Sequence, residues 1–487
     1  MGIPARISSF GSLRRRFLHA CATAAPGNPA RGRSSIRLAL LLPLFVAAAL
    51  LTASAPALAA APTPAAGVVL ANTGTPHISD LKALGTHWVR VFVPWPNLEP
   101  QPGTLASNWL YYYEQLFRSL PAHTKVIADV VETPQWETGS PDVHAPPANP
   151  QDYAAFAGML AQHWAGRVAA YEIWNEEDNS SWWTGAPNPG AYAALLKATY
   201  PVVKAADPAA TVVLGGLTGN DYTFLEGVYA AGGKGSFDAV GVHTDTACDV
   251  SAPSSFGRFP NGRMLPDSFL AYREVHNVEL ANGDDKPIWM TELSWRTTSS
   301  TCDEGTWAGQ KPEGVSDEQQ AAYLAQAYHC MAQSPYVQVA LWFPLQDEGT
   351  SVSGLLRADG SRKPAFAAME DYARHGDQLS GACGDFSGPQ IAIAAPANRT
   401  NYSAALPIHV DARDRLGVGR ITLKIDGKLI RNFTNQSFPA TLAGIMHWHG
   451  AQRIRFGRHR LTFIAVDKSG NESRVSVTII HRRPRRH

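Results

Sequence analysis

The stretch YEIWNEED, from Tyr171 to Asp178, is the most informative part of the sequence. Its first four residues form a short, mostly apolar run, which is followed directly by the amide Asn175 and the carboxylic acid Glu176. Barrels of parallel strands keep their functional side chains at the carboxyl ends of the strands. A single carboxylate after a strand is usually a solvated loop residue. The interpretation therefore depends on a second carboxylate that follows another strand.

Short β-branched apolar runs alternate with longer amphipathic segments from Gly67 to about His375. This alternation is typical of parallel strands joined by crossover helices. The expected strands are Gly67 to Ala71, His87 to Pro94, Lys125 to Val131, Val168 to Trp174, Thr211 to Leu217, Phe237 to His243, Pro287 to Leu293 and Val337 to Phe343. Helical spacing of apolar residues predicts helices over Asp152 to Gly166, Ala191 to Ala206, Ser268 to Leu280 and Ser316 to Met331. Eight strand-helix units predict an α/β fold, a (β/α)8 TIM barrel over residues 66–378.

A small all-β module is expected after the barrel. Residues 379–389 form a predicted linker, residues 390–481 a β-sandwich, and residues 482–487 a basic tail. The expected strands are Ile391 to Ile393, Leu406 to Asp411, Arg420 to Asp426, Phe438 to Leu442, His459 to Val466 and Arg474 to Ile480. Short strands separated by turns are typical of such a sandwich. The run RLTFIAVDKSGN, Arg460 to Asn471, resembles the closing strands of bacterial immunoglobulin-like modules.

The first 60 residues have the layout of a signal peptide. The opening 37 residues contain seven Arg and no acidic residue, and the apolar run Leu38 to Leu51 follows them. This run is shorter than the roughly 20 residues of a transmembrane helix, so we expect cleavage after Ala59 or Ala60 and a secreted or cell-surface protein. An uncleaved amino-terminal anchor is the alternative, because basic residues also precede such anchors.

Composition and charge narrow the classes of protein and of binding partner that the sequence allows. The chain has 487 residues, of which 45% are hydrophobic and 17% charged, which is ordinary for a soluble protein. The formal net charge is +1, yet residues 388–487 carry 17 Lys and Arg against 5 Asp and Glu, a net charge of +12. This basic module suggests an anionic polymer or cell surface as a neighbour, and a merely solvated basic face is the alternative. No motif indicates nucleic-acid binding, and we expect a monomer.

Four cysteines follow the leader. In an oxidising compartment we expect the pairs Cys248 with Cys302 and Cys330 with Cys383, and four free thiols are the alternative. No CxxC or Cys/His cluster suggests a metal site. The chemistry expected below calls for neither a metal nor an organic cofactor.

The second carboxylate is Glu292, in the stretch PIWMTELSW from Pro287 to Trp295. Two carboxylates from different strand ends can face each other across a cleft, where one protonates a leaving oxygen and the other attacks or activates water. Arg90, in WVRVFVPW, is expected to hold Glu292 ionised. His243, in VGVHTD, is a candidate polar orienter, and Trp342, in ALWFPLQD, is a candidate aromatic floor. Asp129 and Glu132 of the third strand are expected to be structural or rim residues.

These motifs together resemble the clan A retaining glycoside hydrolases. The resemblance rests on Asn-Glu after the fourth strand, Glu after the seventh, Arg on the second, Trp on the eighth, and WPNLEPQPG at Trp95 to Gly103. EIWNEED and VGVHTD are most similar to family 39 and its cellulase-like relatives. The resemblance covers the barrel alone. It implies that Glu176 is the acid/base, that Glu292 is the nucleophile, and that Asn175 binds the sugar 2-hydroxyl.

The sequence departs from the family pattern at two places. The family usually has Pro after the acid/base Glu and Tyr close after the sixth-strand His. Here Glu177 takes the first place, and Thr244 and Asp245 follow His243.

The expected function is therefore a secreted retaining glycoside hydrolase that cleaves β-linked poly- or oligosaccharides. Trp183 and Trp295 join Trp342 as expected sugar-binding rings, because an apolar ring face can stack on a pyranose. Two alternatives remain: transglycosylation at the same site, and a barrel that binds glycan at a cell surface without cutting it.

Overall fold

A computed structural model describes residues 63–71, 77–244, 250–302, 309–349 and 351–483. The predicted leader, Asp245 and Cys248 lie outside these ranges. Among the described residues, no helix is both long and apolar enough to span a membrane.

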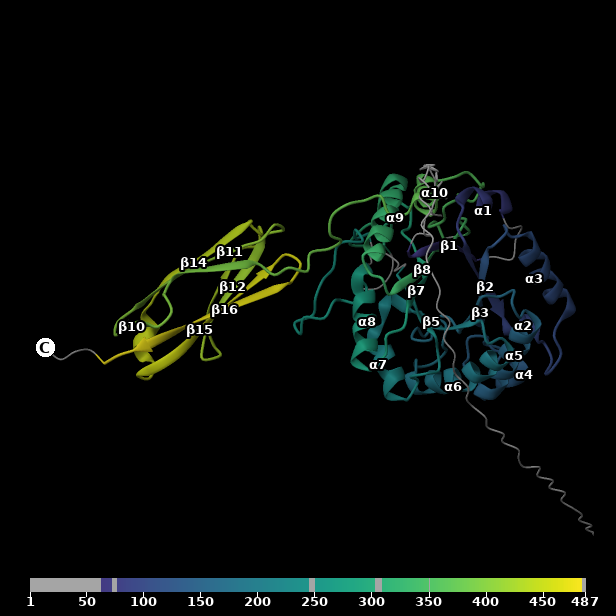
Figure 1. Ribbon diagram of the computed structural model, residues 1–487, viewed down its shortest axis with the longest axis horizontal. Coiled ribbons are helices and arrows are strands. Elements are labelled where there is room, and N and C mark those ends of the chain that lie inside the picture. Colours follow the sequence, from purple (N-terminus) through teal and green to yellow (C-terminus); the bar gives the residue numbers. More distant parts are fainter. Residues whose placement is uncertain (1–62, 72–76, 245–249, 303–308, 350, 484–487) are drawn as a thin grey trace, which may run out of the picture. The chain divides into compact units, whose positions relative to one another are not determined.

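Eight parallel strands close into a barrel, in the order β1 to β8, and helices surround it (Figure 1). The strands are β1 Ala65–Leu70, β2 Trp88–Pro94, β3 Lys125–Val131, β4 Ala170–Ile173, β5 Thr211–Leu217, β6 Ala239–His243, β7 Ile288–Leu293 and β8 Val337–Trp342. The α-helices are α1 Ile78–Leu84, α2 Trp95–Leu98, α3 Ser107–Ser119, α4 Gln135–Thr138, α5 Pro150–His163, α6 Pro189–Ala206, α7 Tyr222–Ala230, α8 Tyr272–Ala281, α9 Asp317–Ala332 and α10 Pro364–His375. The predicted barrel is confirmed, and β3 and β5 have the predicted bounds.

Polar caps start three of the longer helices. The side chains of Asn149 and Asn188 accept hydrogen bonds from the first backbone N–H groups of α5 and α6, and a proline opens each helix. Ser316 and Gln319 form a reciprocal capping box at α9. Such caps satisfy N–H groups that have no partner within the helix.

The barrel interior has an apolar part and a charged part. One cluster of buried residues comprises the inward-facing side chains Val69, Trp88, Ile127, Ala170, Val213, Ala239, Trp289, Val339 and Leu341. Two residues further along β2, β3 and β4, the same inward face carries Arg90, Asp129 and Glu172. Since side chains alternate along a strand, this spacing places the charges nearer the carboxyl ends of the strands, where barrel active sites lie.

The carboxyl-terminal module consists of two sheets, as predicted. One has the order β10, β16, β15, β12, β13, and the other has the order β14, β11, β9. The strands are β9 Gln390–Ala395, β10 Thr400–Tyr402, β11 Leu406–Arg413, β12 Val418–Ile425, β13 Lys428–Thr434, β14 Thr441–Trp448, β15 Gly457–Asp467 and β16 Glu472–His481. The short strand β10 and the largely exposed strand β13 had no apolar alternation to predict them. The segment predicted at Phe438 to Leu442 begins too early, because Phe438 has a left-handed backbone and β14 starts at Thr441.

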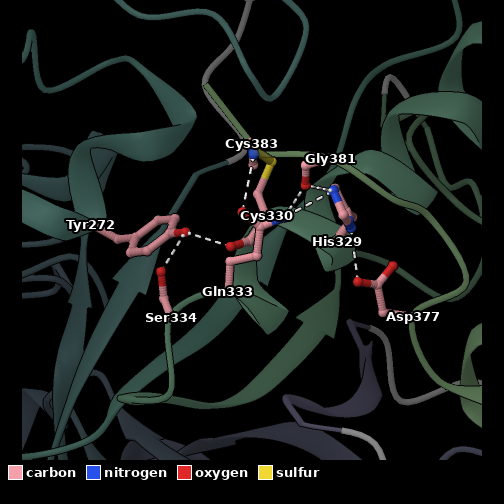
Figure 2. The surroundings of a disulfide bond; sticks show 8 residues. All are labelled: Tyr272, His329, Cys330, Gln333, Ser334, Asp377, Gly381 and Cys383. Carbon is pink, nitrogen blue, oxygen red and sulfur yellow. Dashed lines mark hydrogen bonds and ion pairs between the residues drawn. A yellow bond between two sulfur atoms is a disulfide. The ribbon is translucent and has the colours of Figure 1, made fainter. Parts of the chain in front are cut away.

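A disulfide attaches the segment after α10 to helix α9 (Figure 2). It joins Cys330 to Cys383, as predicted. The carbonyl of Gly381 also accepts hydrogen bonds from His329 of α9 and from Gln333, the residue that follows this helix. The first part of the predicted linker is therefore fixed to the barrel. Cys302 is also disulfide-bonded, and its predicted partner Cys248 lies outside the described residues.

Candidate active site

Arg90 is the centre of a buried charged cluster. Its guanidinium donates to Glu172 Oε2 at 2.5 Å, Glu292 Oε1 at 2.6 Å, Asp129 Oδ2 at 2.8 Å and Asn175 Oδ1 at 2.8 Å. One fully buried cation thus links strands β2, β3, β4 and β7 with the segment that follows β4. Breaking such a network leaves buried charges without partners, which makes each of its members costly to remove.

Three carboxylates face this one guanidinium, so their charges are not balanced. Burial raises the pKa of Asp129 well above its usual value, and the nearby charges of Glu172 and Glu292 raise it further, against the effect of Arg90. Asp129 is thereby favoured as the neutral acid of the cluster. The expectation that Asp129 is structural stays a prediction.

Glu292 combines burial with two neighbouring cations. Burial raises the pKa of its carboxyl above the usual value, and the charges of Glu176 and Glu172 add to this, while the charges of His243 and Arg90 act against it. The ionised form that a nucleophile needs therefore depends on both cations.

The end of β4 holds Glu176 in an uncommon backbone conformation. Trp174 and Glu176 have φ values of 72° and 49°, in the left-handed region that non-glycine residues rarely adopt. Trp174 is anchored there because its indole N–H donates to the carbonyl of Trp182 at 2.8 Å. Glu176 Oε2 accepts a hydrogen bond from Asn179 Nδ2 at 3.1 Å. Backbone strain of this kind clusters at functional sites, and it also ends β4 one residue before the predicted boundary.

His243 lies between the two glutamates. Its Nδ1 is 2.9 Å from Glu176 Oε1, and its Nε2 is 3.9 Å from Glu292 Oε1. Burial alone lowers the pKa of His243, but the charge of Glu292 and the hydrogen bond and charge of Glu176 raise it to about 10. The imidazole is therefore a cation at neutral pH, which donates to Glu176 and stabilises negative charge on Glu292.

Two glycines of β5 make room for this arrangement. A Cβ atom on Gly216 would lie 1.9 Å from His243 Nε2, and one on Gly215 would lie 2.2 Å from Glu177 Oε2. Both distances are far below van der Waals contact. Any side chain at either position would displace a polar group of the site.

Two more carboxylates lie in this region that were not predicted as site residues. Glu172 lies on the inward face of β4 and binds Arg90. Glu177 is 0% exposed, and among the described residues neither of its carboxyl oxygens has a hydrogen-bond partner. Burial raises the pKa of Glu177 well above its usual value, and the charge of Asp178 adds to this effect. An acidic residue inside an apolar strand run was the available signal for Glu172.

The three predicted sugar-binding tryptophans are buried. Trp342, Trp183 and Trp295 are 0%, 3% and 4% exposed. The indole N–H of Trp342 donates to the carbonyl of Ser353 at 2.7 Å, and the ring of Trp183 packs edge-on against Trp174. In this conformation the structure does not bring these three rings to an open surface, and their sugar-binding role stays a prediction.

A different set of rings lines an open cavity at the carboxyl ends of β1, β2 and β3. The cavity has a volume of about 370 Å³, and its lining includes Phe92, Tyr112, Trp182, Phe343 and Glu132. The rings of Phe92 and Trp182 are nearly parallel, with an interplanar angle of 5° and centroids 6.2 Å apart. Trp182 carried no stronger sequence signal than the other tryptophans, and its half-exposed position comes from the fold.

Two groups of side chains have spacings that would admit a metal ion. Glu176, His243 and Glu292 each place one ligand atom within 4.8 Å of the other two, and so do Asp385, Asp414 and Asp467 in the carboxyl-terminal part. In the first group Arg90 and the charged His243 already supply positive charge. The expectation that no metal is needed stays a prediction.

The site can therefore carry out paired acid and nucleophile chemistry. Glu176 is partly exposed, at 15% of its side chain, while Glu292 is 6% exposed and bound to Arg90. One carboxyl is thus more accessible to a leaving group, and the other is held close to fixed cations. Environments that separate two carboxyls in this way assign them different roles.

No family model and no curated protein matches the chain. Among solved structures, a family 39 glycoside hydrolase from the gut symbiont Bacteroides cellulosilyticus WH2 is similar, with 18% identity and a TM-score of 0.51 over 79% of each chain. A monomeric beta-xylosidase from Caulobacter crescentus CB15 has 16% identity and a TM-score of 0.48, over 80% of this chain and 96% of that one. An endo-beta-1,4-mannanase from Thermotoga petrophila has 12% identity and a TM-score of 0.42, over 86% of this chain and 98% of that one. At these identities the likeness concerns architecture, and we conclude that the chain shares the fold of a family 39 glycoside hydrolase.

Proposed function

We propose that this protein is a secreted, monomeric glycoside hydrolase that cleaves β-linked poly- or oligosaccharides with retention of configuration. The observation that carries the proposal is the pairing of Glu176 and Glu292 around His243. One carboxylate oxygen of each glutamate lies within 4.8 Å of the other. Retaining enzymes separate their carboxyls by about 5 to 5.5 Å, whereas inverting enzymes need roughly 6.5 to 9.5 Å to admit a water molecule. The 4.8 Å limit joins single oxygens rather than whole carboxyl groups, and an approach this close suits the narrower, retaining arrangement.

The proposed reaction has two displacements. In the first, a carboxylate oxygen of Glu292 forms a bond to the anomeric carbon while the bond to the leaving oxygen breaks, and Glu176 transfers its proton to that oxygen. In the second, Glu176 removes a proton from water, the water oxygen bonds to the anomeric carbon, and the Glu292 carboxylate leaves. Atoms and charge balance over the cycle, and Glu176 recovers its proton.

The neighbours of the two acids have distinct roles in this proposal. Arg90 and His243 favour the ionised form of Glu292 before attack. Asn175 accepts from Arg90, which orients its side-chain amide and leaves the amide N–H₂ to donate to a substrate hydroxyl. His243 Nδ1 lies 2.9 Å from Glu176 Oε1, so the imidazole holds this carboxyl in place while Glu176 gives up and recovers its proton.

The aromatic cavity supports a saccharide longer than one unit. The guanidinium of Arg90 lies 4.8 Å from the centroid of Phe92, so the cavity wall adjoins the charged cluster. Phe92 and Trp182 offer apolar ring faces next to the carboxyl of Glu132, a combination that suits the apolar faces and hydroxyls of a sugar. We place a second sugar unit of the substrate there.

The deciding experiment is a screen of the purified protein against β-linked glycans, read by product size and by proton NMR of the anomeric product. We expect the first-formed product to keep the β configuration. Glu292→Ala and Glu176→Ala should each lower kcat by at least about a thousandfold, because each removes a reacting group. Glu318→Ala, at an exposed position of α9, is the matched control. Unchanged turnover in either site variant would refute the catalytic role of that residue. A wild type that binds glycans but cleaves none would leave a glycan-binding barrel as the function, and an inverted product would exclude double displacement.

Export is the remaining part of the proposal. The basic leader and its short apolar run support it. Amino-terminal sequencing of protein recovered from the culture medium should begin at Ala60 or Ala61. An intact leader on membrane-bound protein would instead identify an anchor.

A further inference from the structure

The positive charge of the carboxyl-terminal module gathers at one end of its sandwich. Strand register identifies this end, because Leu406 pairs with Trp448, Gly457 pairs with His481, and Tyr402 also pairs with His481. We call it the distal end and define it as residues 402–406, 425–430, 448–458 and 481–483. Its cationic residues are Lys428, Arg453, Arg455, Arg458, Arg482 and Arg483, and its one acidic residue is Asp426.

The opposite end of the sandwich is electrically balanced. Gln390 and Thr441 both pair with Arg413 there, and Val418 pairs with Asp467. Residues 385–390, 411–420, 434–441 and 466–475 contain five Lys and Arg and five Asp and Glu. The distal end has six cations against one anion. The net charge of the module is therefore concentrated rather than spread over a solvated surface.

The distal cations are accessible. Asp426 is already engaged, because it lies 2.7 Å from His459 Nδ1 and accepts from the backbone N–H of Arg460 at 2.9 Å. Arg453, Arg455 and Arg458 are exposed, and within the described part of the chain their side chains make neither a hydrogen bond nor an ion pair. Free guanidinium groups bind carboxylates through two parallel hydrogen bonds.

An aromatic stack stands among these cations. The rings of Tyr402 and His481 are stacked at 4.9 Å with an interplanar angle of 7°, and Phe456 lies 4.6 Å from His481. Phe456 is the outer ring and is 53% exposed. The guanidinium of Arg483 is 5.5 Å from the Phe456 centroid. A fixed apolar ring face is thus bordered by anion-binding groups.

We propose that the distal end binds an acidic polysaccharide, with uronate carboxylates on the arginines and a sugar ring on Phe456. Charge complementarity supplies the first part, and the exposed ring explains a preference for a sugar chain over a simple polyanion. The choice of a polysaccharide as the polymer rests on the proposed glycosidase function. The module would then hold an acidic glycan near the enzyme that cuts it or its neighbours.

The test measures binding of the full-length protein to polygalacturonate by affinity gel electrophoresis at several salt concentrations. Arg455→Glu/Arg458→Glu should weaken retention at least tenfold, and Phe456→Ala should weaken it several-fold. Arg413→Glu/Arg415→Glu is the matched control, because it reverses two exposed charges at the balanced end. We expect that control to stay within twofold of the wild type, and retention to fall as salt rises. Neutral dextran should not retain the protein.

Several results would overturn this assignment. Equal losses in the distal and control variants would show a general charge effect. Tighter binding to vesicles containing phosphatidylserine, or to single-stranded DNA, would identify another class of partner. If the gel retains Phe456→Ala as strongly as the wild type, Phe456 does not bind a sugar ring. Circular dichroism of each variant excludes misfolding. Hydrolysis of small aryl glycosides should be unchanged in all variants. If the wild type is retained by polygalacturonate but hydrolyses no glycan, the proposed function is refuted and this binding surface is not.

Discussion

At the scale of single residues, the charge of the site depends on two cations that contact a larger number of buried carboxylates. Arg90 contacts three acids, and His243 is the second cation within reach of Glu292. Because all of these groups are buried, each charge affects the protonation of its neighbours strongly. Single substitutions should therefore change pH profiles as well as rates.

His243→Asn removes one of the two cations next to Glu292. The charge of His243 lowers the pKa of Glu292, so its loss raises that pKa and extends the range in which the nucleophile is protonated. We expect the acidic limb of kcat/KM to move to higher pH, and the rate below the limb to fall roughly tenfold for each pH unit that the limb moves. His329→Asn, on α9, serves as the control. If kcat falls but the acidic limb stays in place, His243 acts on Glu176 alone and does not affect the protonation of Glu292.

Glu177 should make the protein less stable as pH rises. Its pKa is raised in the folded protein, so the folded state keeps a proton that the unfolded chain releases above its ordinary pKa of about 4.5. Stability from this group is complete below that value and decreases by about 1.4 kcal/mol per pH unit until the raised pKa is reached. Glu177→Gln removes the titration, so its Tm relative to the wild type should rise between pH 5 and pH 8. Parallel Tm curves for the two proteins would contradict this expectation, and exposed Glu472→Gln is the control.

At the scale of elements, strand β5 shapes the site without contributing a reacting group. Its Gly215 and Gly216 leave the space that Glu177 and His243 occupy. The strand end of β4 acts similarly, because its left-handed residues turn Glu176 toward His243.

Gly216→Ala tests this role of β5. The added methyl group would overlap His243 Nε2, so the imidazole must leave its position between Glu176 and Glu292. We expect a loss of kcat of at least tenfold, together with the same change in the pH profile as His243→Asn. Gly67→Ala in β1 is the matched control, because its Cβ would also overlap a neighbour, Leu341, but at the apolar cluster of the barrel. If both variants lose only stability and keep kcat, the position of His243 is not critical.

At the scale of the whole molecule, the disulfide links the end of the barrel domain to its ninth helix. It closes a loop between residues 53 positions apart, around β8 and α10. The hydrogen bonds of Gly381 support the same attachment (Figure 2).

Cys330→Ser/Cys383→Ser should therefore lower the stability of the barrel by about 2 to 4 kcal/mol, mainly because the unfolded chain regains freedom. Thermal unfolding with and without a reducing agent measures this. The reductant should lower the Tm of the wild type and change that of the variant less. Equal Tm values for the oxidised wild type and the variant would show that the hydrogen bonds alone fix the segment.

The sequence by itself determined the architecture and the positions of the principal acids. Strand and helix periods repeat locally, so the eight barrel strands, four of the helices and most of the sandwich could be predicted from neighbouring residues. Asn175, Glu176 and Glu292 could be placed because a strand end is visible in the sequence. Strands β10 and β13 were not predicted, because they lack the alternation of apolar and polar residues that marks a half-buried strand.

Only the tertiary structure decided how these groups affect one another. Arg90 meets Glu292 across 202 positions of sequence, and His243 meets Glu176 across 67. The burial of Trp342, Trp183 and Trp295, and the exposure of Trp182, likewise depend on which loops cover each strand end. Charge interactions and burial act through space and not along the chain, so spacing in the sequence cannot report them.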